Sequence, residues 1–250
     1  MPTHLSEPPM SPTAPKDAGP HLTLAGHLEE LRRRLGACLA ALLVAVGLSV
    51  AYVEQLIGWL SHPVKGLIPQ FAFFTPAEPL VAYVRIAVLG GIILALPVIL
   101  WQVWAFIRTG LTPKERSYGL LFVGWGSVQF LAGAAVAYYG LLPASLRVLL
   151  GIGKRFLVPV ISIDRYLAFV TTLIFWSGVV FELPVVLLVL AKLGIVTAEW
   201  LRQSRPYAIL ILVIVAAVVT PTTDPINLFL LAIPLILLYE LSIFITRLGK

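Results

Sequence analysis

Charged residues are scarce in this chain. Of its 250 residues only 12% are charged while 59% are hydrophobic, and the mean hydropathy is +0.96. A soluble domain carries about 25% charged residues, so this chain has too few charges to coat a soluble core of its size. The composition argues against a soluble globular protein, a disordered chain and a nucleic-acid binder. It predicts an all-α protein that crosses a membrane several times.

Cysteine and histidine are nearly absent as well. Cys38 is the single cysteine, which excludes an internal disulfide and a cysteine-based metal site. No histidine follows His62, so the later apolar segments cannot form a serine–histidine pair. The sequence also lacks the His-Glu-x-x-His and Gly-x-x-x-x-Gly-Lys-Ser/Thr motifs. We therefore expect no catalytic residues, no metal site and no cofactor.

The first 21 residues differ from the rest of the chain. They contain six prolines and almost no aliphatic bulk, which predicts a disordered tail. Leucines then recur at helical spacing at Leu24, Leu28, Leu31 and Leu35. This spacing predicts a short amphipathic helix that lies on the membrane surface before the first span.

Six apolar segments follow within one predicted transmembrane domain, residues 22–247. They cover residues 36–53, 80–106, 119–142, 166–191, 206–219 and 226–245. Arginines before the first segment could mark a cleavable signal, but its length and the spans that follow favour an uncleaved helix. The fifth segment is only about 21 Å long, as is the part of the sixth before Glu240. We therefore expect this hairpin to thin the bilayer locally.

The distribution of basic residues predicts the orientation. With the N-terminus in the cytoplasm, the inner segments carry twelve Lys and Arg residues and the outer loops carry five. Because cytoplasmic loops are enriched in Lys and Arg, six spans with both termini cytoplasmic are favoured. The expected location is the cell membrane, as a multi-pass protein.

Several short motifs occur in a defined order along the chain. The first precedes the first span and reads His27-Leu-Glu-Glu-Leu-Arg-Arg-Arg-Leu35. At the end of the second span and in the loop after it are Trp101-Gln-Val-Trp-Ala-Phe106, Gly110-Leu111 and Lys114-Glu115-Arg116. The fourth span contains Phe181-Glu182-Leu183-Pro184, and the final hairpin contains Thr220-Pro221, Asp224-Pro225, Leu231-Ala-Ile-Pro234 and Leu238-Tyr239-Glu240. In this order, over residues 22–247, the motifs resemble those of the TatC family, the multispanning subunit of the twin-arginine protein translocase.

The resemblance implies a function. TatC-like proteins recognise signal peptides that carry paired arginines. Together with TatA- and TatB-like single-span partners they move folded proteins across the membrane by using the proton-motive force. They are receptors and scaffolds rather than enzymes, and the resemblance implies more than one copy in the complex. The expected surroundings are the lipid bilayer, with no nucleic acid.

The resemblance also implies roles for individual residues on the cytoplasmic side. Glu30 and Glu115 match the receptor positions for the arginine pair, and Arg32, Phe106 and Leu111 match neighbouring signature positions. A carboxylate suits this role because it can bind a guanidinium in a bidentate manner. Simpler interpretations stay open. Glu30 and Glu115 could form local ion pairs with adjacent basic residues, and Phe106 could anchor the membrane interface.

Three further residues belong to the predicted outer loops. By resemblance, Pro63 and Glu78 lie in the loop that covers the outer side of the protein. Glu78 could instead stabilise the start of the second span through the helix dipole. Asp224 lies in the last outer turn, where capping of the sixth helix is the simplest interpretation.

Glu182 is the carboxylate placed deepest in the predicted membrane. Such residues usually face protein or water. By resemblance, Glu182 and Gln129 would contact the single span of a TatA- or TatB-like partner. Alternatively, Gln129 could hydrogen-bond Glu182 within the molecule. Glu182 could also be the proton site of a small ion-coupled transporter, a rival function, and a purely structural scaffold is a third possibility.

Overall fold

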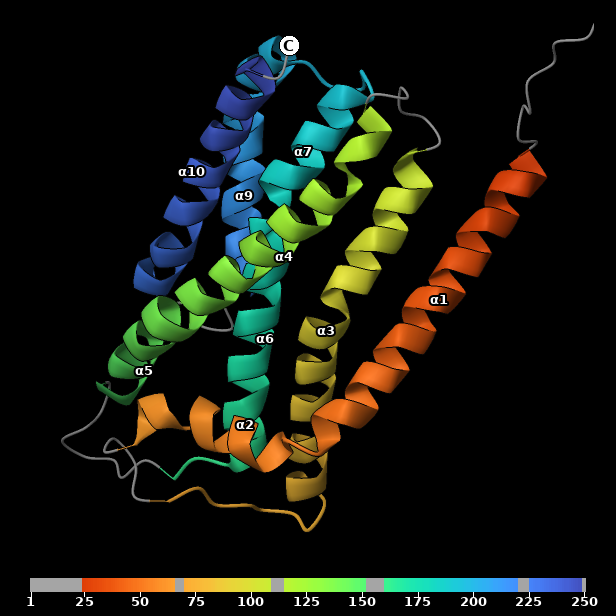
Figure 1. Ribbon diagram of the computed structural model, residues 1–250. Helices are drawn as coiled ribbons and strands as arrows, with labels where there is room; N and C mark the ends of the chain where they lie inside the picture. The colour runs from red at the N-terminus through yellow and green to blue at the C-terminus, as the bar shows by residue number, and fades with distance from the viewer. Residues whose placement is uncertain (1–23, 66–69, 109–114, 152–159, 220–224, 249–250) are drawn as a thin grey trace, which may run out of the picture.

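The computed structural model describes residues 24–65, 70–108, 115–151, 160–219 and 225–248. These residues form helices joined by short loops, with one isolated bridge between Ala72 and Ser162. In Figure 1, α1 begins at the upper end of the molecule and α10 finishes there. The lower end carries α2 and the starts of α3 and α6. The predicted all-α architecture is confirmed.

The first helix is longer than expected. Helix α1 runs without interruption over Leu24–Val50, which is about 40 Å. The predicted separate surface helix is therefore wrong. No proline interrupts the arginine run, and an added Cβ at Gly36 would meet no atom within 4 Å. The helix thus continues from the amphipathic turns into the span and packs along α3.

Two further helices cross the molecule beside α1. Helix α3, Glu78–Ile107, contains Pro97. Helix α4, Gly119–Val136, continues through a π-helical turn, η4, over Ala137–Leu141, into α5, Leu142–Gly151. The helix thus extends well past the predicted end of the third span at residue 142. The π turn ends two residues before Pro143, which cannot donate a helical hydrogen bond.

The predicted fourth span is two helices. Helix α6 covers Ile163–Phe181 and α7 covers Leu183–Lys192, with a break at Glu182. Pro184 explains the break, because it lacks the N–H that would continue α6 and is favoured in the first turn of a helix. Two residues after the end of α7, Gly194 is left-handed with φ of 75°.

The last three helices form a compact unit. They are α8, Ala198–Gln203, α9, Arg205–Val219, and α10, Pro225–Leu248. Figure 1 shows that the lower ends of α9 and α10 stop well above the lower ends of α3 and α6. Helix α9 has 15 residues, or about 22 Å. Helix α9 is thus as short as expected, whereas α10 has 24 residues and continues past Glu240.

A small layer covers the lower end of the bundle. It consists of α2, Val53–Leu60, and η1, His62–Val64, and it lies across the starts of α3 and α6 (Figure 1). Tyr138 and Tyr166 donate to the carbonyls of Trp59 and Leu60, both at 2.7 Å. These carbonyls belong to the last turn of α2 and have no partner within that helix. The two tyrosines therefore fix α2 to the bundle.

Helix α6 is the centre of the packing. In the apolar 18-residue stretch of Ile163–Lys192, half of the residues are buried inside the molecule. In the corresponding stretch of Leu28–Val50, 11% are buried. Within the described residues, four helical stretches are long and apolar enough to cross a membrane: Leu28–Val50, Glu78–Ile107, Arg116–Gly151 and Ile163–Lys192. Helix α9 is apolar but shorter. The predicted count of six spans includes this hairpin and stays a prediction.

Candidate functional site

A half-buried ion pair lies within α1 at the upper end of the molecule, and its arginine also contacts α3. The local pair that the sequence left open for Glu30 is thus present. The Glu30 Oε1 atom accepts from Arg34 Nε at 3.1 Å and from Arg34 Nη2 at 2.5 Å. Both side chains are only 14% exposed. Arg34 Nη1 also donates to Gln102 Oε1 on α3 at 3.3 Å. A carboxylate and an amide oxygen thus hold one guanidinium between the two helices.

The other residues predicted for this site lie at the same end of the molecule. Phe106 is half-buried on α3, one helical turn beyond Gln102, and Arg32 is exposed on α1. Glu115 begins the short helix η3, Glu115–Tyr118, just before α4, but its side chain is outside the described residues, as is Leu111. The structure therefore brings together Glu30 and the α3 segment that carries Gln102 and Phe106.

Glu182 lies at the break between α6 and α7 and faces α4. A Cβ added to Gly126 would lie 3.1 Å from Glu182 Oε2. Glu182 Oε1 is buried, and the described part of the chain offers it no hydrogen-bond partner. Gln129 Nε2 donates at 3.3 Å to the carbonyl of Phe181. Gln129 thus bonds the backbone at the break, and the described residues show no hydrogen bond between Gln129 and Glu182 Oε1.

The predicted residues of the lower end have structural contacts. Ser162 Oγ donates to Glu78 Oε2 at 2.7 Å, and Ser162 also caps α6. Glu78 is the first residue of α3, so it also occupies the N-terminal position at which a negative charge is favourable. Pro63 lies half-buried inside η1. Asp224 is outside the described residues.

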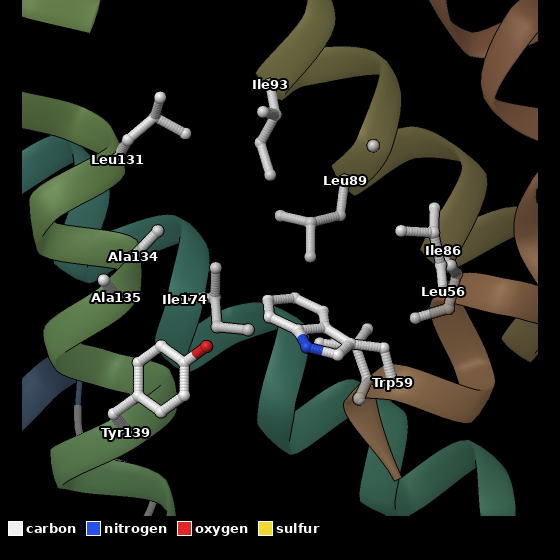
Figure 2. A pocket seen from close by; sticks show the side chains of 12 residues that line it. Leu56, Trp59, Ile86, Leu89, Ile93, Leu131, Ala134, Ala135, Tyr139 and Ile174 are labelled. Carbon is white, nitrogen blue, oxygen red and sulfur yellow. The ribbon is translucent and has the colours of Figure 1, made fainter. Parts of the chain in front are cut away.

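An apolar cavity of about 270 Å³ lies between α2, α3, α4, η4 and α6. Figure 2 shows Trp59 and Tyr139 at one end of it and Ile93 and Leu131 at the other. The remaining lining residues are Leu56, Leu60, Ile86, Leu89, Gly90, Ala134, Ala135 and Ile174. Such a lining suits apolar groups, and the polar side-chain groups in it are the Tyr139 hydroxyl and the Trp59 indole N–H. Over the described ranges, no three His, Cys, Asp or Glu side chains are grouped to hold a metal ion.

Sequence analysis missed several residues that build these sites. Gln102 could have been recognised as a polar side chain between two tryptophans of an apolar segment. Ser162 could also have been recognised, because serine at the start of a helical pattern is a typical N-cap. The roles of Tyr138 and Tyr166 could not have been recognised in the sequence, because only the tertiary structure places α2 against them.

Comparison with known proteins places this arrangement in a family. The family model described as "Sec-independent protein translocase protein (TatC)" matches residues 26–234. Proteins named "Sec-independent protein translocase protein TatC" are similar to the chain. The one from Carboxydothermus hydrogenoformans is 38% identical and covers 92% of this chain and 94% of its own length. The one from Aquifex aeolicus is 37% identical, with 91% and 96% covered.

Solved structures agree with the sequence matches. One described as "Crystal Structure of Twin Arginine Translocase Receptor- TatC" has a TM-score of 0.78 and 36% identity, and the match covers 89% of this chain and 98% of that one. A second structure of that receptor, in DDM, has a TM-score of 0.80.

The fold and these similarities define a class of protein, a membrane-embedded component of a protein translocase. Within that class, the chain belongs to the TatC family. The comparisons therefore favour the translocase over the ion-coupled transporter, and they confirm the resemblance on which the residue assignments were based.

Proposed function

We propose that this chain is the signal-peptide receptor and core scaffold of a twin-arginine translocase. It lies in the cytoplasmic membrane with six spans and both termini in the cytoplasm. The upper end of the molecule then faces the cytoplasm, where signal peptides arrive, and α2 with its neighbouring loops covers the outer side.

The observation that carries this proposal is the environment of Glu30. Its side chain is only 14% exposed, and its carboxylate already holds the guanidinium of Arg34. A carboxylate in such a position binds a guanidinium more strongly than one on an open surface, because water screens the pair less. Glu115 supplies the second carboxylate, and Arg32, Phe106 and Leu111 complete the binding surface.

Transport requires further partners. The chain binds TatA- and TatB-like single-span subunits, assembles with further copies of itself and uses the proton-motive force. Glu182 supports this proposal, because Oε1 is buried at a helix break without a partner among the described residues. A polar group from a partner span could satisfy it, and Gln129 keeps the break open by binding Phe181.

Site-specific photocrosslinking tests the receptor role. A photoreactive amino acid replaces Leu31, which is exposed beside Glu30, or Phe73, which is exposed at the lower end. A twin-arginine peptide is expected to crosslink at position 31 and not at position 73, and a twin-lysine peptide to crosslink less. Equal crosslinking at both positions, or of both peptides at position 31, would contradict the proposal.

A further inference from the structure

The guanidinium of Arg34 is bound as a ligand would be. Three of its N–H groups are engaged, two by Glu30 Oε1 and one by Gln102 Oε1. The acceptors come from two different helices, and the pair is largely shielded from solvent. The two neighbouring arginines on α1, Arg32 and Arg33, are exposed instead. Of these three arginines, Arg34 is the one whose guanidinium is held by acceptors from two helices.

This site coincides with the carboxylate that the proposed function assigns to the signal peptide. An incoming arginine pairs best when both carboxylate oxygens are available to its planar fork. Arg34 holds Oε1 with two N–H groups and thereby blocks the bidentate geometry. A peptide arginine and Arg34 therefore cannot both bind Glu30 optimally.

We propose that Arg34 is an internal competitor of the signal peptide. In the resting protein it occupies the Glu30 site in place of a peptide arginine, and peptide binding displaces it. This inference rests on the proposed function, because it requires Glu30 to bind the peptide. Arg34 thus sets a threshold of affinity, so that weakly basic segments do not remain bound.

Competition of this kind has a defined thermodynamic signature. The apparent affinity of any ligand for the site equals its intrinsic affinity multiplied by the fraction of molecules in which Arg34 is displaced. Removing Arg34 should therefore strengthen binding of twin-arginine and twin-lysine peptides by the same factor. A purely structural role, as a link between α1 and α3, predicts lower thermal stability and no stronger binding.

The test measures binding of fluorescent twin-arginine and twin-lysine peptides to the full-length protein in nanodiscs. Arg34→Gln is expected to bind both peptides about three- to tenfold more tightly than wild type. Arg34→Lys keeps the charge but loses the fork, so its affinity should be intermediate. Arg33→Gln is the matched control, since it removes the same charge from an exposed neighbour.

The possible outcomes separate the two proposals. Weaker or unchanged binding by Arg34→Gln would overturn the competitor role, as would an equal gain in Arg33→Gln, which would indicate a general charge effect. If Glu30→Gln binds normally in the same assay, the proposed function fails and the competitor role fails with it. Should Arg34→Gln not fold, Gln102→Leu weakens the hold on Arg34 and is expected to raise affinity by a smaller factor.

Discussion

At the scale of single residues, Glu30 and Glu182 are both half-buried, but their carboxylates have different surroundings. Glu30 is bound by Arg34, whereas Glu182 Oε1 lies buried beside Gly126 without a partner in the described ranges. Burial of an unpaired polar atom is unfavourable by about 1–3 kcal/mol. Glu30 is therefore already stabilised by Arg34, while Oε1 of Glu182 has no partner among the residues that the structure describes.

Replacement of Glu182 by Ala is expected to leave the stability of the isolated protein near that of wild type or slightly above it. The side chain contributes no hydrogen bond through Oε1, so little is lost. Crosslinks from the fourth span to a TatA- or TatB-like partner should disappear. Thermal unfolding in detergent and partner crosslinking measure the two effects. A destabilised variant that keeps normal crosslinking per folded molecule would refute the docking role.

Gly133 is expected to tolerate no side chain. A Cβ there would lie 2.6 Å from the Ser177 carbonyl oxygen and 2.7 Å from the Phe181 ring. Gly133→Ala should therefore destabilise the protein by about 1–3 kcal/mol through overpacking between α4 and α6. Gly124→Ala is the control on the same helix, because a Cβ there meets no atom within 4 Å. Equal unfolding temperatures for the two variants would contradict this packing.

The sequence predicted the charged members of the candidate site but not their polar partners. The signature motifs indicated Glu30 and Phe106, because family motifs preserve residue type and order. Gln102 could not be assigned, since its role depends on the register of α3 against α1. The bond between Gln129 and Phe181 was also unpredictable, because it depends on where Pro184 breaks the helix.

At the scale of elements, each difference from the predicted spans has a local cause. Helix α1 continues through the arginine run because nothing in residues 24–50 interrupts a helix, and α6 ends early because Pro184 begins a new helix. Each of the six apolar segments predicted from the sequence overlaps a helix of the structure, and their assignment as six spans stays a prediction. Apolar periodicity could not place breaks or π turns, which depend on single prolines and on packing.

The docking of α2 depends on two tyrosines, and its loss should be measurable. Tyr166→Phe leaves the Leu60 carbonyl without its partner in a buried position, which should destabilise the protein by about 1–3 kcal/mol. Faster hydrogen exchange in α2 and a lower unfolding temperature would report the change. Tyr139→Phe is the control, because Tyr139 is 71% exposed. Unchanged exchange in α2 of Tyr166→Phe would show that other contacts hold this helix.

At the scale of the whole molecule, the helices differ in length and therefore cannot all match one bilayer thickness. Helix α3 has 30 residues and α9 has 15, so a uniform bilayer of about 30 Å cannot match both. An ion pair between Arg205 and Glu240 at 2.6 Å joins the upper parts of α9 and α10. This pair holds α9 and α10 together, and we expect the bilayer to thin around the short helix α9.

The proposed topology makes a direct prediction about accessibility. In a variant without Cys38, single cysteines at Gly66 and Gly153 should react with a membrane-impermeant reagent from outside the cell. A cysteine at Thr112 should react only after the membrane is opened. Outside labelling at Thr112 would overturn the orientation with both termini in the cytoplasm.

The central claim is that Glu30 and Glu115 hold the arginine pair of a signal peptide, and peptide binding to the double variant Glu30→Gln/Glu115→Gln tests it most directly. Glutamine keeps the size of the side chain and removes the charge. Hydrogen bonds to charged groups contribute about 1.5–3 kcal/mol, so the affinity for a twin-arginine peptide should fall at least about tenfold while the protein still inserts. Glu29→Gln, which removes an exposed charge from the same helix, should bind as wild type does. An unchanged affinity in the double variant would contradict the account.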